Sequence, residues 1–250
     1  MFTADDRIAL RDSLIDLARR DARISGVALT GSAALGTEDR WSDIDLAFGV
    51  AASADRAALI GEWTERMYDA HDAVHHTDMS AAGALFRVFL LRNTLQVDLA
   101  FWPESEFGAI ASTFRLVSGS ARERPTPAGP SVEPLIGMAW LYALHARSSI
   151  ARGKPWQAEY MISGARDHVL ALACVRHGVT AVQGRGMDSL PAEVSAPIAA
   201  ALVRSLDAAE LRRAFAGVCE LLLVEIKAVD ADLARRLTPT IRELASVEDD

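Results

Sequence analysis

A proline-rich interruption near the middle of the chain separates two halves with different periodicities. Residues 118–134 read SGSARERPTPAGPSVEP, in which four prolines and several small turn-formers break every regular pattern. Such a run predicts a linker or an irregular crossing. With 250 residues, half of them apolar, the chain is long enough for two domains that each bury a core. We therefore expect one domain over residues 1–121 and a second over residues 133–250.

The first half mixes helical patterns with short apolar or β-branched runs, which is typical of an α/β unit with a mixed sheet. Asn93 and Thr94 separate two apolar runs and indicate a hairpin. The expected helices cover residues 5–21 and 53–70, with a short one following a turn near Gly31, and the expected strands cover residues 26–30, 43–49, 84–92 and 95–102.

The second half is helical almost to its end. Its clearest apolar stripe recurs at intervals of three and four residues, which is the spacing of one helix face, and consists of Leu211, Phe215, Val218, Leu222 and Ile226. The fold class expected for the whole chain is therefore α+β, an N-terminal mixed-sheet domain followed by a C-terminal helical bundle.

Two carboxylates at the start of the second expected strand carry the clearest chemical signal. Asp43 and Asp45 are two residues apart, so they project from one face of a strand while Ile44 points toward the core. Two carboxylates at about 4 Å repel by several kcal/mol at an effective dielectric near 20, so the pair needs a cation. Magnesium fits, because it is bound by one or two carboxylates together with substrate phosphates.

A glycine-serine turn precedes this pair and predicts a phosphate site. Gly31 lets the backbone approach an anion closely, and a helix beginning at Ser32 would direct free N–H groups at a triphosphate. A third carboxylate, Asp98, lies inside an apolar strand, where an unpaired charge is costly. If that strand adjoins the Asp43 strand, the three carboxylates form a cluster able to hold two Mg²⁺ ions for in-line nucleotidyl transfer.

Each of these signals alone has a plainer interpretation. Most glycine-serine pairs are turns, and most isolated Asp-x-Asp pairs are solvated strand starts. In this order and spacing, Gly31, Ser32, Asp43, Asp45 and Asp98 resemble the signature of the DNA polymerase beta-like nucleotidyltransferase superfamily. The combination with a helical C-terminal half resembles the antibiotic nucleotidyltransferases, including the kanamycin and streptomycin enzymes. The resemblance implies Mg²⁺, a nucleoside triphosphate donor, pyrophosphate release and a substrate cleft between two domains.

The second half offers two further candidates. Lys154, one of only two lysines, stands before an amphipathic helix and is a candidate triphosphate contact, although an exposed loop lysine is equally expected. Glu159 on that helix is a candidate general base for the acceptor hydroxyl. The resemblance to the kanamycin enzyme supports both, although the order of the two residues is reversed here. The alternative for Glu159 is an ion pair with Arg166 on the helix surface.

Histidines and tryptophans give weaker signals. His71, His75 and His76 cluster near the end of the third expected helix, and irregular spacing favours surface or cleft-lining histidines over a zinc site. Trp41 and Trp102 flank the acidic residues and could stack on a base, but aromatic residues at strand ends more often lie at the rim of a core.

The charge distribution narrows the class of substrate. The formal net charge is −8, and residues 1–120 contain 11 basic and 18 acidic side chains. Proteins that bind nucleic acid usually present a basic face, so a polymeric nucleic-acid substrate is disfavoured. The apolar runs are too short for a membrane span, and the charged N-terminus does not resemble a signal peptide, so we expect a cytoplasmic protein.

The expected activity is Mg²⁺-dependent transfer of a nucleoside monophosphate, AMP from ATP, to a hydroxyl group of a small molecule. An aminoglycoside-type antibiotic is one candidate acceptor. Two alternatives stay open: a nucleotidyltransferase that modifies a protein, as antitoxin-like members do, and a non-catalytic nucleotide-binding module. The acceptor, the nucleotide and the choice between monomer and homodimer are left open by the sequence.

Overall fold

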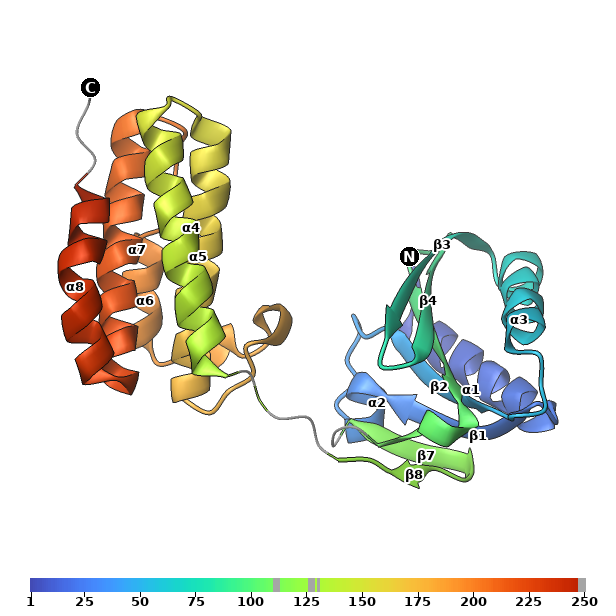
Figure 1. The fold of residues 1–250 in the computed structure, drawn as a ribbon. Coiled ribbons are helices and arrows are strands. Elements are labelled where there is room, and N and C mark those ends of the chain that lie inside the picture. The colour runs from blue at the N-terminus through green and yellow to red at the C-terminus, as the bar shows by residue number, and fades with distance from the viewer. Residues whose placement is uncertain (110–112, 126–128, 130, 247–250) are drawn as a thin grey trace. The chain divides into compact units, whose positions relative to one another are not determined.

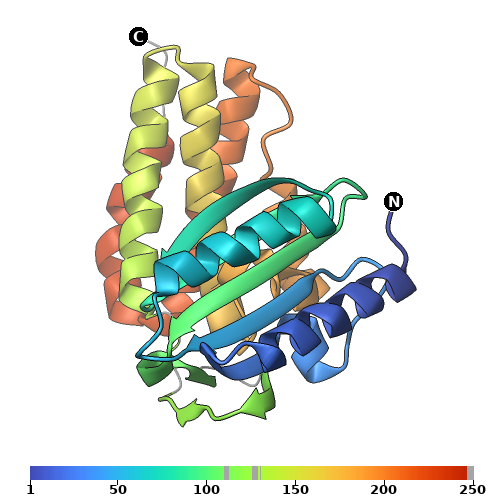
Figure 2. The same ribbon diagram turned by 90° about the vertical axis from the view of Figure 1, so that its right-hand side faces the viewer.

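The computed structural model describes residues 1–109, 113–125, 129 and 131–246. The chain divides into two compact units, Met1–Ala128 and Gly129–Asp250. Figures 1 and 2 show a mixed sheet with helices in the first and a helical bundle in the second, so the predicted α+β class is confirmed. Residues 126–128 and 130 of the expected linker lie outside the described residues. Among the described residues, none of the helices combines the length and apolar character needed to cross a membrane.

The first unit is built on a six-stranded sheet of order β3-β4-β5-β2-β1-β7. Only β2 and β5 pair in parallel within it, and the other neighbours are antiparallel. The helices are α1 (Ala4–Arg20), α2 (Gly31–Leu35) and α3 (Arg56–Ala70), and the strands of the sheet are β1 (Ile24–Thr30), β2 (Ile44–Val50), β3 (Ala73–Ala81), β4 (Ala84–Leu91), β5 (Gln96–Pro103) and β7 (Phe114–Gly119). A 3-10 turn, Glu104–Glu106, and the short pair β6 (Gly108–Ala109) and β8 (Arg122–Glu123) complete the unit.

The main core of this unit lies between one face of the sheet and two helices. In Figure 2, α1 and α3 cover the same face of the sheet. Alternate residues of β2, among them Ile44 and Leu46, point into this core and pack with Leu14 of α1 and Trp63 of α3. The intervening residues of β2 therefore face the opposite side of the sheet, where a smaller cluster contains Ala47, Ala100 and Trp102.

Two strands of the sheet, β3 and β7, were not among the expected elements. The sequence did not indicate β3, because eight of its nine side chains are half-buried or exposed and show no apolar alternation, and all six residues of β7 are likewise half-buried or exposed. The structure places His75 and His76 in β3 rather than at the end of α3, since the chain turns at Asp72 with a φ of 55°. The predicted hairpin at Asn93 and Thr94 is confirmed by the antiparallel pairing of β4 with β5.

The second unit contains five α-helices among its described residues. These are α4 (Val132–Ala151), α5 (Pro155–Arg176), α6 (Ala192–Ala200), α7 (Ala208–Val229) and α8 (Ala231–Ala245), with short 3-10 turns at Val182–Gly184 and Met187–Ser189. All five residues of the stripe expected on α7 are buried in one core. Helices α4 and α5 pack closely at Gly164, where an added Cβ would lie 2.5 Å from the ring of Tyr142.

Candidate active site

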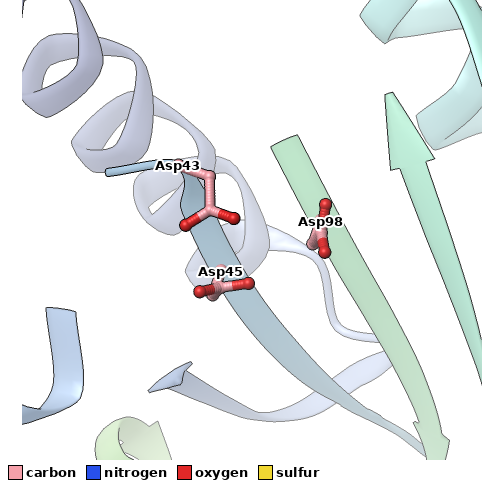
Figure 3. Close-up of side chains that lie close together, drawn as sticks. All are labelled: Asp43, Asp45 and Asp98. Carbon is pink, nitrogen blue, oxygen red and sulfur yellow. The ribbon is translucent and has the colours of Figure 1, made fainter. Parts of the chain in front are cut away.

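Three aspartates from two neighbouring strands lie together on the sheet face opposite α1 and α3. Asp43 directly precedes β2, Asp45 is the second residue of β2, and Asp98 is the third residue of β5. Because β2 and β5 pair in parallel, Asp45 lies directly across from Asp98. One carboxylate oxygen from each residue lies within 4.8 Å of the others, and all three side chains are half-buried (Figure 3). The predicted adjacency of the two strands is thus confirmed.

The electrostatics of the cluster favour a cation. The pKa of Asp98 is raised to about 6, chiefly because burial disfavours its ionised form; a hydrogen bond from Gln96 lowers it, and the negative charge of Asp43 raises it. This carboxyl group therefore binds a proton more tightly than an exposed aspartate does. A divalent cation would compete with that proton and relieve the repulsion that the three carboxylates share.

Gln96 is a member of the site that the sequence did not single out. Its amide Nε2 donates to Asp98 Oδ1 at 3.0 Å and to Asp43 Oδ2 at 3.3 Å, so one amide links carboxylates from both strands. The available signal was positional, because Gln96 lies two residues before Asp98 and shares its strand face. A neutral hydrogen-bond donor between two acidic side chains can be recognised only when the pairing of the strands is known.

The glycine-serine turn adjoins this cluster. Helix α2 begins at Gly31, one residue earlier than expected, and Gly31 has a left-handed φ of 59°. A Cβ at this position would lie 2.1 Å from Asp45 Oδ2, so only glycine lets the turn and the carboxylate approach so closely. Ser32 follows in the first turn of α2. The turn expected to bind phosphate and the candidate metal ligands are therefore neighbours.

The oxygen set suits magnesium. Mg²⁺ is a hard cation that takes oxygen ligands and is usually bound by a few carboxylates with substrate phosphates. Among the residues that the structure describes, Asp43, Asp45 and Asp98 are the one group of three or more histidine, cysteine, aspartate or glutamate side chains positioned to hold a metal. The three half-buried carboxylates would hold the ion and leave its remaining positions for phosphate oxygens.

Lys154 and Glu159 belong to the second unit, and their predicted roles stay predictions. Lys154 is the exposed residue that precedes α5, and Pro155 occupies the first turn as expected. Glu159 is half-buried and accepts a hydrogen bond of 2.7 Å from the Ser163 hydroxyl. The alternative of a Glu159–Arg166 ion pair does not match the contacts of Arg166, which pairs with Asp167 at 2.7 Å and donates to Ser163.

The remaining aromatic candidates have distinct environments. The side chain of Trp102 is only 6% exposed, lies in the smaller cluster of the sheet and is covered by the guanidinium of Arg124, so it is a core residue. Trp41 is 71% exposed, and Arg40 lies over its ring. His76 bonds to the hydroxyl of Tyr68 through Nδ1 at 2.9 Å.

Comparison with known proteins defines the class of the first unit. Residues 11–112 match the family model of the nucleotidyltransferase domain, a segment that contains all three aspartates and the glycine-serine turn. The match covers less than half of the 250 residues, and it shows that the N-terminal unit carries a nucleotidyltransferase domain. The predicted superfamily is confirmed at the level of this domain.

One solved structure similar to the whole chain is that of an aminoglycoside 6-adenyltransferase from Bacillus subtilis. The alignment covers 98% of this chain and 100% of that one, with 13% sequence identity and a TM-score of 0.43. A similarity this distant carries no argument about substrate. No curated protein matches the chain significantly.

Proposed function

We propose that this nucleotidyltransferase transfers AMP from ATP to a hydroxyl group of a small acceptor molecule in a Mg²⁺-dependent reaction. The observation that carries the proposal is the cluster of Asp43, Asp45 and Asp98, whose oxygens converge within 4.8 Å in a domain of the nucleotidyltransferase family. Convergent half-buried carboxylates are costly without a cation, and nucleotidyl transfer uses divalent cations to bind the donor phosphates.

The three carboxylates would divide the metal ligands between them. Asp43 and Asp45 are proposed to hold both ions, and Asp98 to complete the coordination of the catalytic one. When bound, Mg²⁺ would supply charge neutralisation for the phosphate oxygens and for the developing negative charge of the transition state. Gln96 would hold Asp98 and Asp43 in place through its two amide contacts.

The glycine-serine turn is proposed to receive the β- and γ-phosphates of the donor. The contact between Gly31 and Asp45 supports this, because phosphates bound at the turn would lie beside the metal ligands. Helix α2 has only five residues, so close approach of its backbone N–H groups, rather than a long helix dipole, would provide the binding energy.

The chemical step would be an in-line displacement. The acceptor oxygen attacks the α-phosphorus, the bond to the bridging oxygen of the β-phosphate breaks, and pyrophosphate leaves. We propose Glu159 as the base that takes the proton of the acceptor hydroxyl, since its carboxylate is half-buried and oriented by Ser163. Lys154 is proposed to contact the triphosphate as a mobile positive charge.

The acceptor is proposed to be a hydroxylated small molecule, with aminoglycosides as the first class to test. The second unit has its own buried core and is large enough to carry a dedicated acceptor site. A nucleic-acid acceptor is disfavoured by the excess of acidic side chains in residues 1–120. An ATP-dependent reaction also fits the cytoplasmic location that we propose.

Calorimetric titration of the full chain with ATP, with and without Mg²⁺, tests the metal and donor. We expect ATP binding that requires Mg²⁺ and is lost in Asp43→Asn/Asp45→Asn, because that variant removes two of the three metal ligands. Asp12→Asn/Asp16→Asn is the matched control: it removes the same charge from exposed positions of α1 and is expected to bind ATP like the natural chain. Equal ATP affinity with and without Mg²⁺ would contradict the proposal.

A further inference from the structure

Arg7 places a buried charge on the core-facing side of α1. The start of this helix is set by a capping box in which the Thr3 hydroxyl accepts from Asp6 N, and the Asp6 carboxylate accepts from Thr3 N. Arg7 therefore lies in the first turn, in line with Leu14 and Ala18, which are buried on the same helix face. The Arg7 side chain is only 3% exposed. An apolar residue would be the ordinary choice at such a position.

The guanidinium of Arg7 reaches the loop between α2 and β2. Its Nη1 donates to the carbonyl oxygens of Asp39 and Ser42, the latter at 3.4 Å. Its Nε lies 3.3 Å from Glu38 Oε1, an ion pair without hydrogen-bond geometry, and Arg11 binds the other oxygen of Glu38 at 2.7 Å. Two arginines of one helix thus hold a loop more than 25 residues away in sequence.

Hydrogen bonds within the loop between α2 and β2 also hold its residues together. Asp39 Oδ1 accepts from Trp41 N at 2.8 Å and from the Ser42 hydroxyl at 3.1 Å, and Ser42 Oγ accepts from Asp39 N at 2.8 Å. These hydrogen bonds lower the pKa of Asp39, so its carboxylate stays ionised. Hydrogen bonds thus link Asp39 directly to Ser42, the residue that immediately precedes Asp43.

We propose that Arg7 is a positioning residue that acts through this loop on Asp43, and so tunes the affinity of the site for Mg²⁺ and ATP. The inference rests on the proposed function. A buried charge is costly unless it is well paired, and apolar residues often replace both members of a buried ion pair without loss of stability. The presence of a charged Arg7 at this buried position therefore suggests that its contacts fix the conformation of the loop between α2 and β2. Removing a residue that orients a metal ligand typically costs about 10- to 100-fold in metal affinity.

The test compares two Arg7 variants with a control from the same unit. Arg7→Met removes both carbonyl contacts and the ion pair, whereas Arg7→Lys keeps the buried charge beside Glu38. Arg23→Met is the control, because Arg23 forms ion pairs in the same unit, with Asp21 and Glu62, but does not contact the loop. Mg²⁺-dependent ATP binding by the full chain is measured by calorimetry, and thermal unfolding is followed in parallel.

We expect Arg7→Met to bind ATP and Mg²⁺ about 10-fold more weakly, with Arg7→Lys in between. Arg23→Met should lower the unfolding temperature but stay within about twofold of the natural affinity. Natural affinity in a folded Arg7→Met, or an equal loss in Arg23→Met, overturns the inference. If Arg7→Met does not fold, Arg7→Lys decides, and natural affinity there overturns it as well.

Failure of the proposed function gives a different result. In that case the natural chain itself shows no Mg²⁺-dependent ATP binding, and the proposal for Arg7 is refuted together with the proposed function. If the natural chain binds and Asp43→Asn/Asp45→Asn does not, the proposed site stands, and the Arg7 variants alone decide the present inference.

Discussion

Asp98→Asn is expected to reduce nucleotidyl transfer about a thousandfold and yet to stabilise the metal-free protein above pH 7. The loss follows because removing a metal ligand forfeits several kcal/mol of transition-state stabilisation, and each 1.36 kcal/mol is about tenfold in rate. The gain in stability has a separate cause. The carboxyl group of Asp98 is held among other acids and partly removed from water, so its ionised form is unfavourable in the folded state.

The pH dependence distinguishes this cause from other effects of the substitution. The pKa of Asp98 is raised from 3.8 to about 6 on folding, so the folded state binds its proton more tightly than the unfolded state does. Asp98 therefore contributes a loss of stability as the pH rises from about 4 through 6, and Asp98→Asn lacks this contribution. After discounting for solvent screening at a half-buried group, we expect a gain of about 1 to 2 kcal/mol for the variant.

Urea unfolding of both proteins at pH 4 and pH 7.5, without metal and then with excess Mg²⁺, measures this difference. The two proteins should be nearly equally stable at pH 4, and the variant more stable at pH 7.5. Excess Mg²⁺ should stabilise the natural chain and remove the difference, because binding to the folded state adds to its stability. A variant that is less stable at pH 7.5 without metal would refute this account of Asp98.

Gly31→Ala is expected to abolish Mg²⁺-dependent ATP binding. The new Cβ would lie 2.1 Å from Asp45 Oδ2, a distance that forces either the turn or the carboxylate to move. The positive φ adds a strain of about 1 kcal/mol for a residue with a side chain. Loss of the metal ligand and of the phosphate turn together should reduce transfer by about a thousandfold or more.

Gly36→Ala is the matched control for this substitution. Gly36 ends α2 with a φ of 69°, so alanine there carries similar backbone strain, but no atom lies within 4 Å of the added Cβ. Thermal unfolding and calorimetry of the two variants separate the contributions. Both should lose stability, and only Gly31→Ala should lose ATP binding. An equal loss of ATP binding in Gly36→Ala would mean that strain in α2, rather than the contact with Asp45, is responsible.

The acidic cluster was predictable because it depends on strand alternation and on the adjacency of two apolar strands. Asp43 and Asp45 are separated by a core residue, and Asp98 is flanked by two others, so each must project to the opposite face. The same rule did not reveal Gln96, since a neutral amide is informative only when the register with Asp43 is known. Nor does alternation reveal β3, which is a polar strand at the sheet edge.

The contacts of Arg7 and Glu159 are further features that could not be predicted from the sequence. Arg7 lies in line with buried apolar residues, which is a signal, but its partners are carbonyl groups of a loop that no side-chain pattern identifies. For Glu159, helical spacing indicated Arg166 as an ion-pair partner. The rotamer of Arg166 instead directs its guanidinium toward Asp167, and Ser163 takes the contact with Glu159. Spacing on a helix restricts which residues can meet, and packing decides which of them do.

Pyrophosphate release from ATP and Mg²⁺, measured across a panel of aminoglycosides, lincosamides and other hydroxylated small molecules, tests the central claim most directly. Asp43→Asn/Asp45→Asn serves as the blank. We predict release with at least one acceptor in the natural chain and none in the double variant. Release that persists undiminished in the double variant would contradict a reaction carried by the aspartate cluster.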